Sequence, residues 1–482
     1  MLTTSTGIML FLGYAVFIIV LVVVTKKKRE TADDFLVMER SLGLFRGSLS
    51  MAVSWIWAPA VFICSLKSFT QGLPGIFWFT APNILCFFVF AVFAVRLRDR
   101  FPDGYTIAEA FRLRFGERRT HLAALVVAFG YQLGAVIINC VAGATLINLL
   151  SGIPYHVGVL MMGGLALSYS LISGLRASVV SDVAQMLMVL VIALFLVPWA
   201  VGEAGGISKV TDGFAGVTGE FGNLFDPWVA YSFGIATTIG LISGPVADQM
   251  FSQRAFAAKR QSIVPIFVIA GLVFGIVPIV LSIFGFIGAA EVRAGNLVVD
   301  DAQMVGPVVV GHLLPTWALG LFAIMAFAGL TSTLDSAFSA IGSLSSIDLP
   351  NRPDRDTQDS SRLLSARMGM ALFAILGIGI ALLRPQLLWV FLVYGALAAS
   401  LFFPAFLMLF WQNLTSSGAF WGIVAGLVVG TPLSIYANIS GNTHLIVASA
   451  LLGLIVAGLA AAAVSIASRS EQEANHDSRT HP

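Results

Sequence analysis

The sequence has too few charged residues for a protein surrounded by water. Only 11% of its 482 residues are Asp, Glu, Lys or Arg, whereas soluble domains carry roughly 25%. Hydrophobic residues make up 58%, and the mean hydropathy is +0.91. They form blocks of about 20 residues between short charged or Gly/Pro-rich breaks, the pattern of membrane-spanning helices. The composition therefore excludes a soluble protein and predicts a polytopic membrane protein in contact with the lipid bilayer.

Cysteine is also scarce, and several familiar motifs are missing. Cys64, Cys86 and Cys140 lie inside apolar blocks without paired spacing, which excludes a disulfide framework and a Cys/His metal site. No Walker-type phosphate loop is present, which disfavours ATP-driven pumping. We therefore predict a protein that is not an enzyme and has no nucleic-acid partner.

The positions of the basic residues predict an orientation. The first apolar block has no basic residue before it and Lys26–Arg29 after it, the reverse of a cleavable signal peptide. With the N-terminus outside, all but four of the 27 basic residues fall on the cytoplasmic side; the four are Lys67, Lys209, Arg293 and Arg384. The positive-inside rule then predicts an external N-terminus and a cytoplasmic C-terminus in the cell (cytoplasmic) membrane.

We predict an all-α fold with about thirteen spans. They lie near residues 6–25, 44–70, 74–97, 120–150, 155–173, 177–201, 227–249, 263–288, 314–346, 365–383, 386–411, 419–437 and 443–467.

Two of these spans contain helix-breaking residues. The second has Pro59 in mid-span, and the seventh has Gly240, Gly244 and Pro245. Proline removes a backbone donor and frees carbonyl groups, which persist in lipid only if protein, water or an ion satisfies them. One such proline is usually an ordinary kink. Two interrupted spans, five helices apart, instead indicate a five-plus-five inverted repeat with its binding site at the breaks.

This repeat defines the predicted organisation. An N-terminal flanking helix and cytoplasmic loop (1–43) precede a first repeat (44–201), and an external loop (202–226) leads to a second repeat (227–411). C-terminal flanking helices (412–468) and a cytoplasmic tail (469–482) complete the chain.

A polar stretch, "AFAGLTSTLDSAFSAIGSLSSIDL" at 326–349, occupies the ninth span. Most of its hydroxyls can be explained by bonds back to the preceding helical turn. Asp335 cannot, because a carboxylate at a helix centre costs on the order of 2.5 kcal/mol unless it is solvated or paired, and so it indicates a functional cavity. Asp182, one turn before Gln185 near the start of the sixth span, is either a second such acid or a helix cap. Oxygen-rich sites of this kind suit a hard cation such as Na⁺.

Four stretches together resemble the sodium:solute symporter family: "RSLG" (40–43), "SGLRASVVSDVAQ" (173–185), "DQMFSQRAFAAK" (248–259) and "TSTLDSAFSAIGSLSSIDL" (331–349). The resemblance implies a LeuT-type fold, with two inverted repeats of five helices and discontinuous second and seventh spans. It also implies secondary active uptake of a small organic solute with Na⁺ by alternating access, and H⁺ is the alternative coupling ion.

The resemblance also implies an ion site. By this resemblance, the main sodium site of the family would here consist of the carbonyl groups of Val53, Ile56 and Gly329 and the hydroxyls of Ser332 and Thr333.

A second ion or proton position would combine Asp182 and Ser332 with Asp335 and Ser336, and here Asp335 stands where relatives usually carry a hydroxyl. If the fold brings Asp182 close to Asp335, the two carboxylates should not both stay ionised unless a cation lies between them. The pair is therefore expected to bind either Na⁺ or H⁺.

The substrate is less well defined. "SWIWAPAVF" and "GLPGIFWFTAPN" resemble the urea-active transporter branch of the family, which suggests urea, another small neutral solute or an amino acid. Eight side chains are candidates for its pocket: Trp55, Trp57, Phe77, Tyr131, Gln132, Tyr231, Thr237 and Ser243. Packing of the aromatic residues and interhelical hydrogen bonds of the polar ones are the competing explanations. A transporter-fold sensor and a passive small-solute channel are the alternative functions, and the sequence leaves the oligomeric state open.

Overall fold

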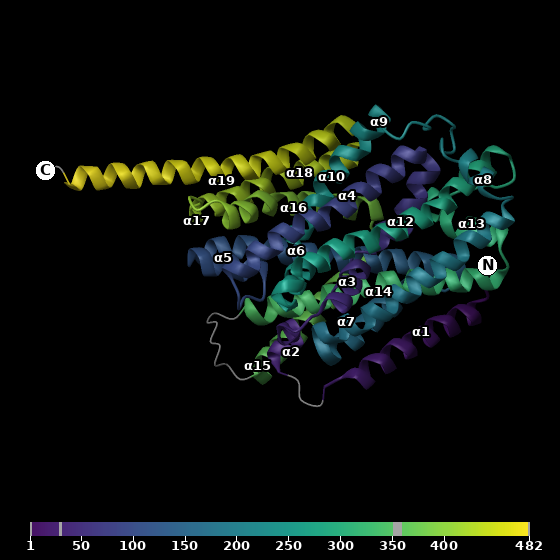
Figure 1. Cartoon of the computed structure of the whole chain (residues 1–482), viewed down its shortest axis with the longest axis horizontal. Coiled ribbons are helices and arrows are strands. Elements are labelled where there is room, and N and C mark those ends of the chain that lie inside the picture. Colours follow the sequence, from purple (N-terminus) through teal and green to yellow (C-terminus); the bar gives the residue numbers. More distant parts are fainter. Residues whose placement is uncertain (1, 28–30, 350–358, 481–482) are drawn as a thin grey trace.

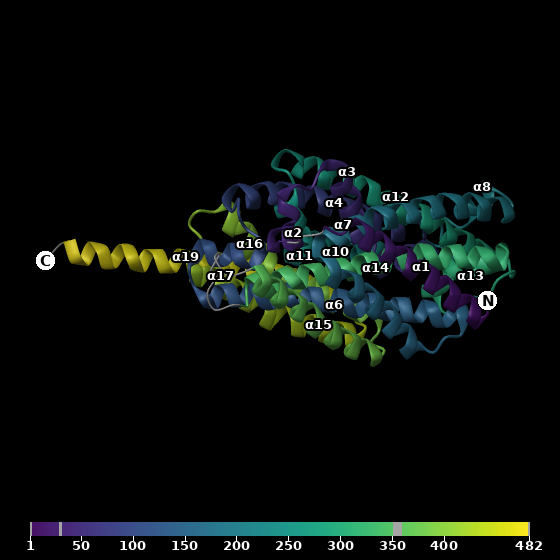
Figure 2. The same ribbon diagram turned by 90° about the horizontal axis from the view of Figure 1, so that it is seen from below.

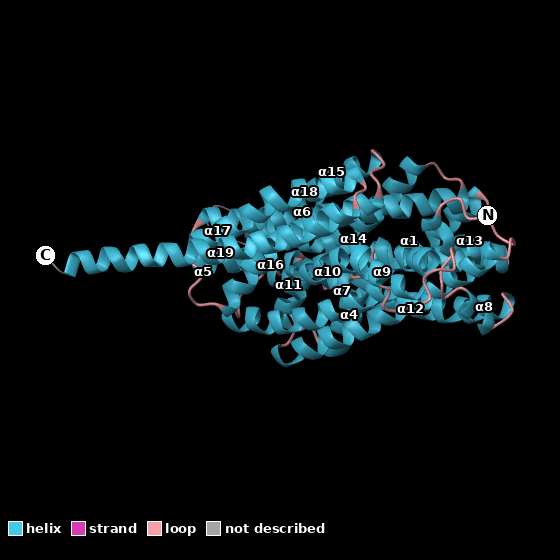
Figure 3. Ribbon diagram, turned by 90° about the horizontal axis from the view of Figure 1, so that it is seen from above, coloured by secondary structure: helices cyan, strands magenta, loops and turns pink. Residues whose placement is uncertain are grey.

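The computed structural model describes residues 2–27, 31–349 and 359–480, and within these ranges it is a bundle of helices without a β-sheet (Figure 1). Long helices run side by side along the longest axis of the molecule, as the views from below and above also show (Figures 2 and 3). The termini lie at opposite ends of the bundle, and the C-terminal part of α19 projects beyond it. This arrangement confirms the predicted all-α class.

The first half of the chain contains α1 (Thr4–Thr25), α2 (Ala32–Val37), η1 (Met38–Arg40), α3 (Leu44–Ser54), η2 (Pro59–Ile63), α4 (Cys64–Arg100), α5 (Ile107–Phe115), α6 (Arg118–Ser151), α7 (Tyr155–Glu203) and α8 (Ile207–Asp212). The second half contains α9 (Pro227–Val229), η3 (Ala230–Gly234), α10 (Ile235–Ala247), α11 (Gln249–Ala257), η4 (Arg260–Ser262), α12 (Ile263–Arg293), η5 (Ala302–Met304), α13 (Val305–Leu313) and α14 (Thr316–Ile347). It continues with α15 (Asp359–Leu382), α16 (Leu387–Phe410), α17 (Ser416–Ala425), η6 (Gly426–Gly430), α18 (Thr431–Ser440) and α19 (Thr443–Thr480).

The described residues include 11 helices that are long and apolar enough to cross a membrane. The predicted number of thirteen is not confirmed, because two of these helices each hold parts of two predicted spans. α4 is interrupted at Gly72 and α7 at Ser173–Gly174, where the backbone leaves the helical region. The predicted breaks between spans thus appear as kinks rather than as separate loops.

Gly72 shows why one of these kinks needs glycine. Its φ of 57° lies in the left-handed region, and a Cβ built there would come within 2.2 Å of the carbonyl oxygen of Phe214 in the connection before α9. A side chain at this position would therefore be strained and would also collide with backbone.

The two predicted helix breaks are present. α3 ends at Ser54, and the chain is not helical from Trp55 to Trp57 before it turns into η2. α10 ends at Ala247, Asp248 is extended with ψ of 109°, and α11 begins at Gln249. The second and seventh spans are therefore discontinuous, as predicted, although the seventh breaks at Asp248 and not at Gly240 or Gly244.

Two predicted boundaries were wrong. Residues 250–257 were expected in a cytoplasmic connection, but α11 is buried along its whole length. Its residues Gln253 and Arg254 are hydrogen-bonded inside the protein, so their polarity did not mark a water-exposed loop. At the C-terminus, the apolar span ends at Ser470, close to the predicted 467, but the polar tail predicted from residue 469 is helical, because α19 continues to Thr480.

Candidate ion and substrate sites

The hydroxyl-rich part of α14 faces the break that follows α3. Thr333 donates a hydrogen bond from Oγ1 to the carbonyl oxygen of Ser54 at 3.1 Å. A Cβ built on Gly329 would lie 2.9 Å from the carbonyl oxygen of Ile56, so the glycine allows α14 to approach the non-helical backbone closely. This contact places backbone carbonyls of one broken helix against the hydroxyls of α14.

The residues expected to form the main sodium site lie around this contact. The Val53 carbonyl accepts a bond from the Ile56 N–H at 2.8 Å, and Thr333 also donates to the Gly329 carbonyl at 3.3 Å. Ser332, next to Thr333, donates to Asp182. Carbonyl and hydroxyl oxygens are neutral, hard ligands of the type that Na⁺ accepts. The structure thus brings all five predicted residues to one place.

Asp182 lies in the interior of α7 and is fully buried. Its Oδ2 accepts hydrogen bonds from the Ser50 hydroxyl at 2.5 Å and from Ser54 at 3.4 Å, and Oδ1 accepts from Ser332. These partners come from α3 and α14, on either side of α7. The alternative interpretation of Asp182 as a helix cap was therefore wrong, and the residue instead joins three helices.

The group that neutralises Asp182 was not predicted from the sequence. Arg254 on α11 is fully buried, and its Nη2 lies 2.9 Å from Asp182 Oδ2. The same nitrogen donates to the hydroxyls of Ser54 and Ser336, each at 2.7 Å. Arg254 had been assigned to the cytoplasmic side, but the structure buries it in the predicted second ion position.

Asp335 is the second buried carboxylate, and hydroxyl groups surround it. It accepts hydrogen bonds from Tyr169 at 2.7 Å, from Ser178 at 2.6 Å and from Ser181 at 3.1 Å. Ser178 also reaches Asp182 Oδ2 at 3.3 Å, so a single hydroxyl links the two acids. Within the described part of the chain, Asp335 makes no ion pair comparable to that of Asp182. With both acids ionised, this cluster has one negative charge more than Arg254 compensates.

Gln185, one turn after Asp182, belongs to a neighbouring network. Its amide donates to the Tyr14 hydroxyl at 2.9 Å and to Thr331 Oγ1 at 3.0 Å. These bonds hold α1 against α7 and α14, so the role of Gln185 here is structural.

A large cavity of about 530 Å³ reaches the break that follows α3. Its wall includes Asp301 and Gln303 near η5, Trp228 on α9, and Pro59 at the start of η2. Lys67 also lines it, with its ammonium group 3.9 Å from the centre of the Phe233 ring. We call this cavity the vestibule.

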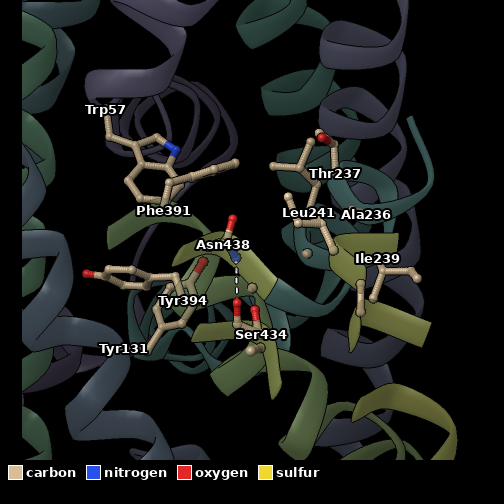
Figure 4. Close-up of a pocket in the computed structure, with 15 residues that line it drawn as sticks. Trp57, Tyr131, Ala236, Thr237, Ile239, Leu241, Phe391, Tyr394, Ser434 and Asn438 are labelled. Carbon is tan, nitrogen blue, oxygen red and sulfur yellow. Dashed lines mark hydrogen bonds between the residues drawn. The ribbon is translucent and has the colours of Figure 1, made fainter. Parts of the chain in front are cut away.

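A small pocket of about 40 Å³ adjoins the vestibule, and both share Thr237 and Phe391 (Figure 4). Trp57 and Phe391 lie together on one side, with ring centres 5.6 Å apart. Tyr131 and Tyr394 lie next to them and meet edge to face at 5.0 Å. The pocket thus has one aromatic side, and aliphatic residues complete its lining together with the polar residues Thr237, Ser434 and Asn438.

The predicted substrate residues divide into two groups. Trp57, Tyr131 and Thr237 line the small pocket. The others do not line either cavity; they are Trp55, Phe77, Gln132, Tyr231 and Ser243.

Hydrogen bonds and packing account for most of this second group. Trp55 donates from Nε1 to Asn83 at 2.8 Å inside an aromatic cluster. Phe77 packs against Trp78, and Tyr231 is hydrogen-bonded to His444 at 2.8 Å.

The family model described as "Sodium:solute symporter family" matches residues 35–426. The chain belongs to the sodium:solute symporter family. It is similar to a urea-proton symporter, DUR3, of Oryza sativa subsp. japonica, with 22% identity over 96% of this chain and 71% of that protein. It is also similar to the sodium/pantothenate symporter of Escherichia coli strain K12, with 28% identity over 69% of this chain and 68% of that protein.

The fold is that of a solved Na⁺-coupled sialic acid symporter in a substrate-bound, outward-open state. The TM-score is 0.80 and the identity 16%, over 95% of this chain and 97% of that one. A nucleobase-cation-symport-1 family transporter, MHP1, is more distant, with a TM-score of 0.56, 17% identity, and coverage of 88% and 93%. The LeuT-type architecture is therefore confirmed, and the chain is a cation-coupled symporter of a small solute.

Two further functional candidates of this symporter were missed in the sequence. Asp248 is fully buried at the break of the seventh span, where it accepts bonds from the Met250 N–H and the Gln132 amide, both at 2.8 Å. Nothing in the sequence distinguished Tyr394 from the other Phe and Tyr residues, of which the chain has 45 in all. The available signal for Asp248 and Arg254 was their position directly after a Gly/Pro-interrupted span, where a second half-helix can follow.

Proposed function

We propose that this symporter carries urea, or another small neutral solute of similar size, into the cell together with Na⁺. The observation that carries the proposal is the small pocket between Trp57 at the first helix break and residues 236–241 of α10, since a volume of about 40 Å³ suits a solute of a few non-hydrogen atoms. The names of two relatives support it, the urea-proton symporter of rice and a probable urea active transporter of Schizosaccharomyces pombe. The proposed orientation has the N-terminus outside, the C-terminus cytoplasmic and the vestibule open to the outside of the cell membrane.

The coupling Na⁺ is proposed to bind at the break of α3. The carbonyls of Val53 and Ile56 would provide ligands from one side; Gly329, Ser332 and Thr333 of α14 would provide them from the other. Because the ligands come from two separate elements, Na⁺ would stabilise the state in which α14 and the broken helix are in contact. Alternating access would then follow movement of one repeat (44–201) relative to the other (227–411) around the two breaks.

The second ion position is proposed to bind one proton or one Na⁺ at Asp335. Arg254 balances Asp182, and no other positive side chain of the described residues contacts the buried Asp335 carboxylate. A buried charge of this kind is costly, and binding a monovalent cation removes the cost.

The proposed function can be tested with the purified protein in proteoliposomes on a solid-supported membrane. Jumps of urea, proline, short carboxylates and sugars would be applied in Na⁺ and in choline. We expect a current for urea that requires Na⁺. Solute flux that persists without any cation gradient would instead indicate a channel, and saturable binding without flux of any solute would indicate a sensor.

The variant Asp335→Ser is expected to abolish the pH dependence of transport while transport itself continues. In the wild type, protons compete with Na⁺ at Asp335, so the half-saturating Na⁺ concentration should rise as the pH falls. The other ionisable groups around this site are Asp182, Tyr169, Arg254 and Tyr14, and all remain in the variant. The measurement is the Na⁺ dependence of the current at mildly acidic and mildly alkaline pH.

Asp99→Asn is the control for this experiment, because Asp99 is half-exposed and paired with Arg260 far from the site. It should keep the pH dependence of the wild type. An Asp335→Ser protein with unchanged pH dependence would exclude Asp335 as the proton-binding group.

A further inference from the structure

Three arginines from α4 and α5 contact the end of α16; they are Arg96, Arg100 and Arg114. Arg100 donates from Nη1 to the Met408 carbonyl at 3.4 Å, and Arg114 donates from Nη2 to the Trp411 carbonyl at 3.1 Å. The guanidinium carbon of Arg96 lies 5.7 Å from the centre of the Phe410 ring. α5 and α17, the helix after α16, lie at the end of the bundle opposite the N-terminus (Figure 1). We call the three residues the arginine cluster.

The arginine cluster forms no ion pair within the ranges that the structure describes. Asp99, next to Arg100 in sequence, pairs with Arg260 instead. Burial and the nearby charge of Arg100 lower the pKa of Arg114, and the buried Nε–H of Arg114 has no hydrogen-bond partner. A guanidinium group has five N–H donors and binds phosphate through pairs of them. The cluster therefore favours an anion with several acceptor oxygens, such as a phosphate group.

A row of aromatic rings on α16 leads to this cluster. Phe402, Phe406 and Phe410 recur every four residues, so they share one face of the helix. The rings of Phe406 and Phe410 are stacked with centres 4.4 Å apart, and those of Phe402 and Phe406 with centres 6.1 Å apart. All three are only partly buried. On α4, Val92 lies one turn before Arg96 and is 58% exposed. We call the three phenylalanines the phenylalanine strip.

The cluster lies where apolar side chains give way to charged ones. α4 is apolar over residues 84–95 and then reads RLRDR, and α16 ends at Phe410 with Trp411 next to it. Tryptophan is enriched at the level of the lipid headgroups, and basic pockets between membrane helices bind anionic headgroups. A phospholipid has its phosphate at this level and its acyl chains in the apolar layer. Its two parts therefore match the arginine cluster and the phenylalanine strip.

We propose that the arginine cluster binds the headgroup of one anionic phospholipid and that the phenylalanine strip holds its acyl chain. α4 and α5 belong to residues 44–201 and α16 to residues 227–411, so the bound lipid connects the two proposed repeats. None of the six residues lines the vestibule or the small pocket, and the site does not depend on the proposed function. Only its assignment to the cytoplasmic leaflet rests on the proposed orientation.

The test is native mass spectrometry of the full chain, purified in detergent and freed of co-purified lipid. The probes are phosphatidylglycerol, phosphatidylcholine with the same acyl chains, and inorganic phosphate. Both lipids contain a phosphate, but only phosphatidylglycerol has a net negative charge. We expect one retained phosphatidylglycerol per protein, bound about tenfold or more tightly than phosphatidylcholine because several arginines act on its charge. Inorganic phosphate should not displace it, because inorganic phosphate has no acyl chain.

Two variants address the assigned residues. Arg96→Gln and Arg114→Gln should each weaken phosphatidylglycerol binding about fivefold and leave phosphatidylcholine binding nearly unchanged, because each removes one positive charge near the headgroup. Arg114→Gln also loses the bond to the Trp411 carbonyl, so its melting temperature without lipid is measured. If that temperature falls, Arg96→Gln decides, because the contact of Arg96 is with the Phe410 ring. Arg46→Gln, the same change at an exposed position at the start of α3, should bind both lipids like the wild type.

The inference is overturned if the two lipids bind equally well, or if Arg96→Gln and Arg114→Gln bind phosphatidylglycerol as tightly as Arg46→Gln does. Displacement of phosphatidylglycerol by inorganic phosphate would overturn it as well, because the cluster would then recognise a soluble anion. These results can be separated from a failure of the proposed function, because the measurement needs neither a solute nor an ion gradient.

Discussion

Arg254→Met is expected to reduce the free energy of unfolding by about 3–5 kcal/mol. The substitution keeps a long, flexible side chain but leaves Asp182 with a buried charge and no positive partner. The guanidinium also donates to the hydroxyls of Ser50 and Ser54, so several hydrogen bonds are lost together. Thermal and chemical denaturation of the purified protein in detergent would measure the loss.

A double variant shows whether the charge is responsible. Arg254→Met combined with Asp182→Asn removes both charges, so it should recover most of the stability lost in the single variant. Arg260→Met is the matched control, because Arg260 pairs with Asp99 at the surface, where both side chains are about half exposed. It should cost no more than about 1 kcal/mol. A double variant as unstable as Arg254→Met would show that packing, not charge, explains the effect.

Thr333→Val is expected to raise the half-saturating Na⁺ concentration by about tenfold to a hundredfold. The change keeps the shape of the side chain and removes one proposed oxygen ligand, and contacts to a charged group contribute about 1.5–3 kcal/mol each. The variant should still fold, because it loses only two hydrogen bonds of ordinary length, those from Thr333 to the backbone carbonyl groups of Ser54 and Gly329. The measurement is the Na⁺ dependence of the solute-induced current.

Thr331→Val provides the control on the same helix. The Thr331 hydroxyl bonds to Tyr14 and to the Phe327 carbonyl, away from the break of α3. This variant should keep the Na⁺ affinity of the wild type even if it is less stable. Equal Na⁺ affinities of Thr333→Val and the wild type would contradict the proposed sodium site.

The predictions rest on residues that conflict with their surroundings; the broken helices are confirmed, and the ion-binding role of Asp335 stays a prediction. Asp335 stands out in an apolar helix because a carboxylate there needs a solvating or charged partner. Pro59 and the glycines of the seventh span predict broken helices because they weaken or remove helical hydrogen bonds, although the seventh span breaks only at Asp248. Local chemistry was enough to infer these features without knowing which helices meet.

The features that were missed depend on tertiary contacts. Arg254 follows a span and precedes Lys259 and Arg260, so it resembles a residue of a positively charged cytoplasmic loop. Only the return of α11 into the bundle places it beside Asp182, which is 72 residues away in the chain. The hydrogen bond from Gln132 to Asp248 was hidden for the same reason, because the two residues are 116 positions apart in the chain.

The two helix breaks also create partial charges that come from the backbone and not from any side chain. α3 ends at the proposed sodium site with its C-terminus, and α11 begins beside Asp248 with its N-terminus. Aligned peptide dipoles place roughly half a negative charge at a helix C-terminus and half a positive charge at an N-terminus. These partial charges belong to the backbone, so they neither titrate nor disappear when a side chain is replaced. Each break therefore brings a helix C-terminus, which favours cations, next to the N-terminus of the following helix, which favours negative charge, and both are built into the path of the chain itself.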